Sequence, residues 1–239
     1  MINSLSVIFP LYNEAKRLHH TFKDIEKFEK KKIIKNVEYI FVNDGSNDDS
    51  KKIIYSYLKL KKSNKFKVIN IKKNKGKGNA LKKGIINSKK DWILTLDTDI
   101  SVSILQLNEW IRKNYLNRKV QIYFGSRNLN NSKVEFKLHR KILGIVFSFI
   151  LKLLLKINIK DTQCGFKLYE NKKAKFLFKK IKDDGFVHDV EISLLSKKYN
   201  LKLKELPVKW SHKKDSKINL FTDTIEMFYK LIVIRKYYI

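Results

Sequence analysis

The sequence is poor in cysteine and proline. Cys164 is the single cysteine, and only two prolines occur in 239 residues. One cysteine excludes an intrachain disulfide and a cysteine-rich zinc site, and it fits a reducing compartment. Neither an internal repeat nor a linker rich in Pro, Gly and Ser divides the chain. A single domain is therefore the simplest interpretation, and the 43% hydrophobic content is enough for a core.

Long apolar runs are also absent. A membrane-spanning helix needs roughly 18 uninterrupted apolar residues. The nearest candidate, "ILGIVFSFILKLLL" at 142–155, is shorter and contains Lys152. The first residues, "MINSLSVIFPLYNE", have no basic segment leading into a long apolar core. We therefore expect neither a signal peptide nor a transmembrane helix.

Acidic residues are few, since 23 Asp and Glu stand against 53 Lys and Arg, and the formal net charge is +30. This charge favours phosphate-bearing partners such as nucleotides, nucleic acid or an anionic membrane surface. The excess is mostly lysine in a chain also rich in Asn and Ile, a composition that a genome-wide base bias also produces. A solvated basic surface is therefore an equal alternative, and charge alone does not choose the partner.

Short apolar runs alternate with segments of helical periodicity. The apolar runs lie at 5–10, 37–44, 66–71, 92–97 and 120–126, and the helical segments lie near 16–31, 48–61, 77–88 and 103–116. This alternation predicts βαβ units and an α/β fold with a mostly parallel sheet flanked by helices. Ligands of such sheets bind beyond the carboxyl ends of the strands. The polar clusters of this sequence follow the apolar runs and so belong at that edge.

Three of these clusters carry residues suited to phosphate or metal. Asp97 and Asp99 end the fourth run, in "DWILTLDTDIS". Two close carboxylates repel each other unless a cation lies between them, although an acidic turn or helix cap is the alternative. "VNDGSNDDS" places Asp44 and Gly45 after the second run, where a plain βα turn is the alternative. "NKGKGNA" is a basic loop that can present backbone N–H groups and Lys77 to phosphate, but it lacks the Walker spacing.

Taken together, the motifs resemble a known family. "VIFPLYNE", "YIFVNDGSNDDS", "NKGKGNAL", "LDTD", "GSRN" and "DTQCGFKLY" occur in the order seen in family 2 inverting glycosyltransferases with the GT-A fold. "FVHDVEI", "ELPVKW" and "LIVIRKYY" are similar to the dolichyl-phosphate β-glucosyltransferase branch. The resemblance spans nearly the whole chain. It implies a Rossmann-like GT-A domain over 1–239, with a nucleotide-sugar-binding half at 1–126 and an acceptor-binding half at 127–239.

The resemblance implies a role for each donor-side residue. Asp97 and Asp99 correspond to the D-x-D pair that holds Mg²⁺ or Mn²⁺ against the two phosphates of the donor, a role that suits oxygen ligands. Relatives that make polyprenyl-phosphate mannose often carry a glutamine two residues after the second aspartate, as a further metal contact. In this sequence Ser101 occupies that position. The remaining residues implied for the donor pocket are Pro10, Tyr12, Glu14 and Asp44, of which Asp44 would contact the base.

The implied acceptor is a polyprenyl phosphate. Because a phosphate is already a nucleophile at neutral pH, positioning and charge neutralisation should dominate over base catalysis. We expect Arg127 and Arg140 to hold this phosphate, with surface ion pairs as the alternative. The resemblance places Asp161 near the reacting centre, and Asp189 is a candidate base.

Other polar residues of the acceptor half have two interpretations each. Asp189 and Glu191 could instead act as partners of a helix dipole. His188 borders the site or is structural. Cys164 is expected to pack rather than to act as a nucleophile, because no activating group accompanies it.

Two apolar helical stretches with basic residues, 138–156 and 218–236, could lie in a membrane interface. Covering the sheet or forming a dimer contact is the alternative. Because the eukaryotic membrane anchor of the branch has no counterpart here, we expect peripheral attachment to an anionic surface on the cytoplasmic face of the membrane.

The sequence thus predicts transfer of a hexose, most simply glucose from UDP-glucose, to a polyprenyl phosphate with inversion. One alternative is mannose or another sugar transferred from a different nucleotide sugar to a lipid or glycan. A basic nucleic-acid-binding protein is the alternative outside the enzymes. Acidic residues in three separate loops would repel a phosphate backbone, so we expect no nucleic-acid partner.

Overall fold

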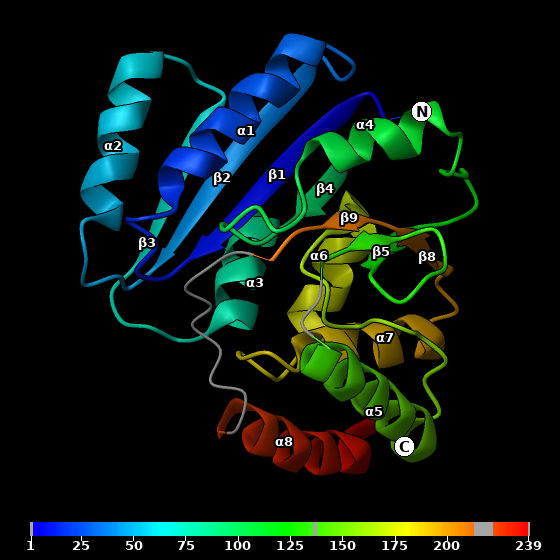
Figure 1. The fold of residues 1–239 in the computed structure, drawn as a ribbon. Coiled ribbons are helices and arrows are strands. Elements are labelled where there is room, and N and C mark those ends of the chain that lie inside the picture. The colour runs from blue at the N-terminus through cyan, green and yellow to red at the C-terminus, as the bar shows by residue number, and fades with distance from the viewer. Residues whose placement is uncertain (1, 136–137, 213–221, 239) are drawn as a thin grey trace.

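A seven-stranded sheet forms the centre of the molecule (Figure 1). The computed structural model describes residues 2–135, 138–212 and 222–238, apart from the side chains of 138–143, 145 and 222–228. The strands, in their order across the sheet, are β3 (Phe66–Ile71), β2 (Asn36–Asp44), β1 (Ser4–Leu11), β4 (Trp92–Thr95), β7 (Lys167–Glu170), β5 (Ile122–Ser126) and β8 (Leu203–Pro207). Only β7 runs antiparallel to its neighbours in this sheet. The predicted single α/β domain with a mostly parallel sheet is confirmed.

Helices cover both faces of the sheet, which explains why the central strands carry apolar residues at successive positions. Successive residues of a strand point to opposite faces, and in β1 Val7 packs on one side and Ile8 on the other. The first face is covered by α1 (Leu18–Lys31), α2 (Ser50–Lys61) and α4 (Leu105–Arg112). The second is covered by α3 (Lys77–Asn87), α6 (Asn171–Lys180) and α7 (His188–Lys198).

Two further helices form an outer layer on α7. They are α5 (Leu138–Leu155) and α8 (Thr222–Tyr238), and Figure 1 shows them at the lower end of the molecule. Both helices join one buried apolar cluster with α7. The predicted helix at 138–156 is present, whereas the first part of the predicted helix at 218–236 lies outside the described residues. A small second sheet, β6 (Lys133–Val134) paired with β9 (Lys209–Trp210), lies beside the main one.

Candidate active site

A pocket of about 550 Å³ opens at the carboxyl ends of β1, β2 and β4. It lies at the edge where parallel α/β sheets bind ligands. Of the residues that the sequence predicted for the site, the following line this pocket: Pro10, Tyr12, Glu14, Asp44, Lys77, Asp97, Asp99, Ser101, Arg127, His188 and Asp189. Asp161 is not among its lining residues. Arg140 belongs to α5, and its side chain lies outside the described part of the structure.

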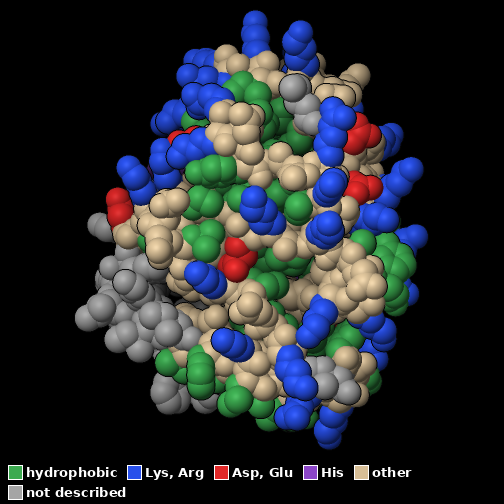
Figure 2. Space-filling view, turned by 90° about the vertical axis from the view of Figure 1, so that its right-hand side faces the viewer, with side chains coloured by type: hydrophobic (Ala, Val, Ile, Leu, Met, Phe, Trp, Pro, Cys, Tyr) green, Lys and Arg blue, Asp and Glu red, His purple; other side chains and the backbone are tan. Residues whose placement is uncertain are grey.

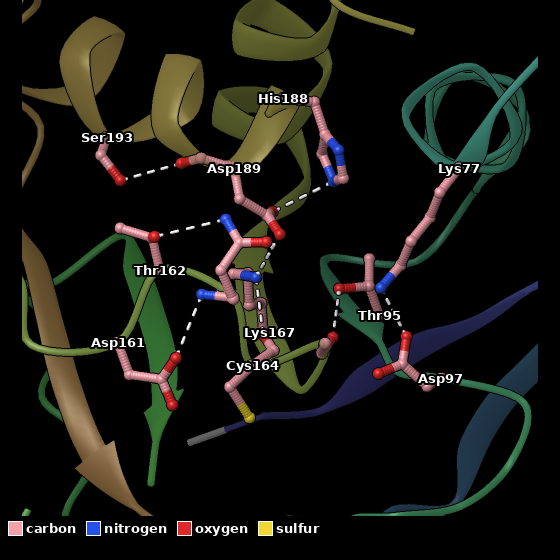
Figure 3. Close-up of polar contacts among 12 residues, drawn as sticks. Lys77, Thr95, Asp97, Asp161, Thr162, Cys164, Lys167, His188, Asp189 and Ser193 are labelled. Carbon is pink, nitrogen blue, oxygen red and sulfur yellow. Dashed lines mark hydrogen bonds and ion pairs between the residues drawn. The ribbon is translucent and has the colours of Figure 1, made fainter. Parts of the chain in front are cut away.

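The two carboxylates after β4 differ in their surroundings. Lys77 Nζ lies 2.5 Å from Asp97 Oδ1 (Figure 3). Burial opposes the ionisation of Asp97, but Lys77 outweighs it and lowers the pKa of Asp97. Burial and the nearby charge of Asp97 raise the pKa of Asp99, although Asp99 Oδ1 accepts the Ser101 N–H at 2.9 Å. Asp99 thus lies in a place where more positive charge would be favourable.

These residues fit a hard divalent cation. Asp97 and Asp99 offer carboxylate oxygens, the ligands that Mg²⁺ and Mn²⁺ prefer. Within the described residues, no group of three or more His, Cys, Asp or Glu side chains converges on a metal position. An ion held by one or two carboxylates completes its shell with phosphate oxygens and water. The donor set is therefore suited to an ion that arrives together with a phosphorylated ligand.

Asp44 braces the loop that precedes α3. Its carboxylate accepts the backbone N–H of Lys75 at 3.0 Å and of Gly76 at 2.8 Å. Burial raises the pKa of Asp44, while these two N–H groups work in the opposite direction. Gly45 makes the approach of the two loops feasible, since it has a φ of +71° and a Cβ there would lie 2.6 Å from the backbone nitrogen of Asn74.

The start of α3 differs from the sequence expectation. The N–H groups of Gly78 and Asn79 donate to the carbonyl oxygens of Gly185 and Asp184, at 3.1 and 3.0 Å. Together with the two that Asp44 accepts, four backbone N–H groups of this loop already have protein partners. The expectation that these groups present themselves to phosphate is therefore wrong, and the loop contributes the side chain of Lys77 instead.

Sequence reasoning missed Arg17, which also lines the pocket. Its Nε and Nη2 lie 2.5 Å from the two carboxylate oxygens of Glu14, and its Nη1 lies 3.9 Å from Asp99 Oδ2. Glu14 thus holds Arg17 in a bidentate pair beside the D-x-D segment. Arginine is scarce in this lysine-rich chain, with Arg17 and Arg127 among its few arginines, and this scarcity is the signal that could have pointed to Arg17.

Asp161 lies behind Arg127 rather than in the pocket. Its Oδ2 accepts the Arg127 backbone N–H at 2.9 Å and Nε at 2.7 Å, and its Oδ1 accepts Nη2 at 2.9 Å. Burial opposes ionisation of Asp161, but Arg127 outweighs it and lowers the pKa of the carboxyl. Asp161 therefore positions Arg127, whose side chain reaches the pocket.

A buried charge network forms the pocket wall at the start of α7 (Figure 3). Asp189 lies 2.8 Å from Lys167 Nζ and 3.1 Å from His188 Nε2. His188 Nδ1 lies 2.7 Å from the carbonyl oxygen of Gly185. Although burial opposes ionisation, His188 and Lys167 hold the pKa of Asp189 far below its usual range. Lys167 was not predicted from the sequence, where a lysine in a strand is one of many.

Glu191 and Cys164 lie outside the pocket lining. Glu191 is fully buried and accepts the backbone N–H groups of Lys182 and Asp183 at 3.0 and 2.8 Å, so it braces the loop before α7. Burial raises the pKa of the Cys164 thiol to about 12, so the thiol stays protonated at neutral pH. A protonated, buried thiol is a poor nucleophile, as the packing role predicted.

The family model for Glycosyl transferase family 2 matches residues 6–178, which include the D-x-D segment and Arg127. The chain belongs to glycosyl transferase family 2. This membership and the fold make it a glycosyltransferase, and the predicted family is confirmed.

Curated relatives of this family 2 chain align over nearly its whole length. A dolichyl-phosphate beta-glucosyltransferase of Dictyostelium discoideum is 34% identical over 98% of the chain and 75% of the relative. The human dolichyl-phosphate beta-glucosyltransferase is 31% identical over 98% of the chain and 76% of the relative. The predicted likeness to this branch is confirmed.

Solved structures with the same fold include two sugar-phosphate synthases. Glucosyl-3-phosphoglycerate synthase from Mycobacterium tuberculosis, in complex with Mn²⁺, UDP and glucosyl-3-phosphoglycerate, has a TM-score of 0.68 at 14% identity over 98% of this chain and 80% of that chain. Mannosyl-3-phosphoglycerate synthase from Rubrobacter xylanophilus has a TM-score of 0.66 at 14% identity over 97% and 72%. At this identity the likeness concerns the fold, which is GT-A as predicted.

Proposed function

We propose that this glycosyltransferase transfers glucose from UDP-glucose to a polyprenyl phosphate, with inversion at the anomeric carbon. The observation that carries the proposal is that one pocket contains both a pair of carboxylates suited to a metal ion and an arginine suited to an anionic acceptor. The carboxylates of Asp97 and Asp99 lie with Lys77 at the end of β4, and Arg127 lines the same pocket from the loop after β5. A metal-assisted donor and an anionic acceptor require these two kinds of groups.

On the donor side, Asp97 and Asp99 would hold Mg²⁺ or Mn²⁺, and Lys77 would contact the phosphates. The ion, when bound, supplies positive charge that neutralises the pyrophosphate. The ion pair with Asp97 already holds the ammonium group of Lys77 beside the D-x-D carboxylates. The walls that would enclose the nucleoside are formed by Pro10, Tyr12, Glu14 and Asp44.

On the acceptor side, Arg127 would hold the polyprenyl phosphate in line with the donor, with Arg140 as a further predicted contact. A phosphate oxygen of the acceptor forms a bond to C1 of glucose as the bond from C1 to the UDP oxygen breaks, and the electron pair leaves with UDP. The acceptor oxygen is already ionised, so no proton has to move. Asp161 keeps the guanidinium of Arg127 oriented through three hydrogen bonds.

Asp189 would act as a fixed negative charge rather than as a base. His188 and Lys167 stabilise its ionised form and keep its pKa far below neutrality, despite its burial. A carboxylate with so low a pKa is a weak proton acceptor. It suits an acceptor that needs no deprotonation and a sugar that gains positive charge as the donor bond breaks.

We also infer that the enzyme works at the cytoplasmic face of a membrane, attached peripherally to anionic lipid. A polyprenyl acceptor resides in a bilayer, and the chain carries a formal charge of +30. No helix among the described residues combines the length and the hydropathy needed to span a bilayer.

A donor screen tests the proposal. Purified protein with Mg²⁺ or Mn²⁺ and a short-chain polyprenyl phosphate in detergent is offered UDP-glucose, GDP-mannose and other nucleotide sugars, and release of the nucleotide is measured. We expect acceptor-dependent release of UDP from UDP-glucose, lost on adding EDTA. Preferential release of GDP from GDP-mannose would contradict the donor assignment. A folded protein that binds no nucleotide and releases none from any donor would contradict the enzymatic role.

A further inference from the structure

Helix α5 exposes apolar side chains on the face turned away from the protein. Its inner face is buried through Leu151 and Leu155, which pack in the cluster on α7. On the outer face Phe149 is 65% exposed and Leu153 is 70% exposed, and Val146 is also exposed. These three follow one another at spacings of three and four residues, so they share one stripe of the helix. A helix that is apolar on every side normally has all its sides covered.

Helix α8 repeats this arrangement. Leu231 and Ile234 are buried in the same cluster, whereas Tyr229, Ile232 and Tyr237 are exposed. Figure 1 shows α8 next to α5 at the lower end of the molecule. The two helices thus bring six large apolar side chains to the outside of one layer. Exposed apolar side chains gathered on two helices of one layer are typical of an interaction surface.

Positive charge accompanies this apolar surface. Lys152 on α5, Lys156 directly after its last residue, and Arg235 and Lys236 on α8 are all exposed. The sequence has no Asp or Glu between 138 and 160 or between 227 and 239. In Figure 2, Lys and Arg side chains lie among hydrophobic ones at the lower end of the molecule. Apolar side chains interspersed with cations favour an interface that is apolar in depth and anionic at its surface.

We propose that the outer faces of α5 and α8 form a membrane-binding surface that lies on an anionic lipid bilayer. The apolar stripes enter the boundary between headgroups and acyl chains, and the four cations contact lipid phosphates and carboxylates. A second copy of the chain is the weaker occupant, because two such faces would bring eight like charges together. Attachment in the plane of the interface requires no spanning helix.

The surface is coupled to the pocket through α7. Its first residues, His188 and Asp189, line the pocket, and Val190 and Leu194 pack in the cluster beneath α5 and α8. A bilayer contacting α5 and α8 therefore lies one helix away from the pocket. The coupling between this surface and the pocket rests on the proposed function, since its purpose is to bring the phosphate of a membrane-held acceptor to Arg127.

Vesicle co-sedimentation of the purified full chain tests the surface. Vesicles of phosphatidylcholine are compared with vesicles that also contain phosphatidylserine. We expect binding to the anionic vesicles that weakens with added salt. The double variant Phe149→Ser/Leu153→Ser should bind at least about tenfold more weakly, because two apolar side chains no longer enter the lipid. The matched control is Leu60→Ser on α2, where an 81% exposed leucine lies far from this surface.

A charge series separates this surface from general basicity. Lys152→Glu/Lys156→Glu should weaken binding to anionic vesicles several-fold more than Lys51→Glu/Lys52→Glu, which changes two exposed lysines of α2. Equal losses in the two double variants would overturn the proposal, as would unchanged binding of Phe149→Ser/Leu153→Ser. Analytical ultracentrifugation adds a further outcome. A wild-type dimer that becomes a monomer in Phe149→Ser/Leu153→Ser would assign the surface to a second copy and would also overturn the proposal.

An activity assay distinguishes a failure of the membrane-binding proposal from a failure of the proposed function. Phe149→Ser/Leu153→Ser should keep wild-type transfer to a short-chain acceptor in detergent and lose transfer to a long-chain acceptor embedded in vesicles. Vesicle binding is measured without substrates, so it holds or fails even if no donor is used. A melting temperature and a circular dichroism spectrum equal to those of the wild type verify that each variant retains the fold.

Discussion

Gly165 lies directly against the carboxylate of Asp97. A Cβ at Gly165 would lie 2.5 Å from Asp97 Cγ and 2.6 Å from Oδ1. The backbone of this loop is held in place, because Thr95 Oγ1 donates to the Gly165 carbonyl at 3.2 Å and Lys167 Nζ donates to the Cys164 carbonyl at 2.6 Å. A side chain at 165 would therefore displace Asp97 rather than the loop.

Gly165→Ala should for this reason weaken metal-dependent donor binding by about tenfold, or about 1.4 kcal/mol. Calorimetric titration of UDP in the presence of Mn²⁺ measures the loss. Gly144→Ala is the matched control, since no heavy atom of the described residues beyond its own helical turn lies within 4 Å of the added Cβ. If the affinity for UDP and Mn²⁺ were unchanged while only the melting temperature fell, Gly165 would have a purely structural role.

Asp99→Asn should abolish transfer with little effect on the fold. The amide removes one of the two anionic groups proposed as metal ligands. It also relieves both the burial of a charge and the repulsion from Asp97, which together raise the pKa of Asp99. We expect EDTA to inactivate the wild type and added Mn²⁺ to restore it, whereas the variant stays inactive. Nucleotide release and thermal unfolding are the measurements, and near-normal turnover in the variant would refute the metal assignment.

Arg127→Lys should raise the KM for the acceptor about tenfold and leave UDP affinity nearly unchanged. Lysine keeps a cation near Asp161 but cannot reproduce the bidentate geometry that arginine offers to a carboxylate or a phosphate. Steady-state kinetics with acceptor and donor varied in turn separate the two effects. Arg118→Lys, at an exposed position, is the control. A larger change in the KM for the donor than in the KM for the acceptor would contradict the assignment of Arg127 to the acceptor phosphate.

Asp161→Asn should cost about 2 kcal/mol in the free energy of unfolding, because it removes the buried counter-ion of the Arg127 guanidinium, whose side chain is itself 22% exposed towards the pocket. Chemical denaturation at about neutral pH measures this loss of stability. A cost below about 1 kcal/mol, the range of exposed ion pairs, would contradict the buried geometry.

The same pair predicts a pH dependence. Despite burial, Arg127 lowers the folded-state pKa of Asp161 below the unfolded value of about 3.9. The stability that Asp161 contributes is therefore present above about pH 4 and is lost as pH falls through the lower folded pKa. The difference in unfolding free energy between wild type and Asp161→Asn should be constant above about pH 5 and shrink below about pH 4. A difference that grew towards acid pH would have the wrong sign.

Most of the site was predictable because parallel strands bring their carboxyl ends to one edge. Asp44, Asp97 and Lys77 lie at three different strand-to-helix connections, and the structure places all three in one pocket. The backbone of the "NKGKGNA" loop was not predictable in the same way. Its N–H groups are used by Asp44 and by the 184–185 carbonyls, and the latter contact joins segments about a hundred residues apart.

The sequence by itself determined the α/β order and the carboxylate pair after β4, and it excluded an intrachain disulfide. These properties depend on periodicity, spacing and composition, which are local or additive. Tertiary structure alone decided that Asp161 holds Arg127, that Lys167 faces Asp189 and that Gly165 lies against Asp97. Each of these pairs joins segments that are distant along the chain. Their contact depends on how helices and strands pack in three dimensions, which no local pattern specifies.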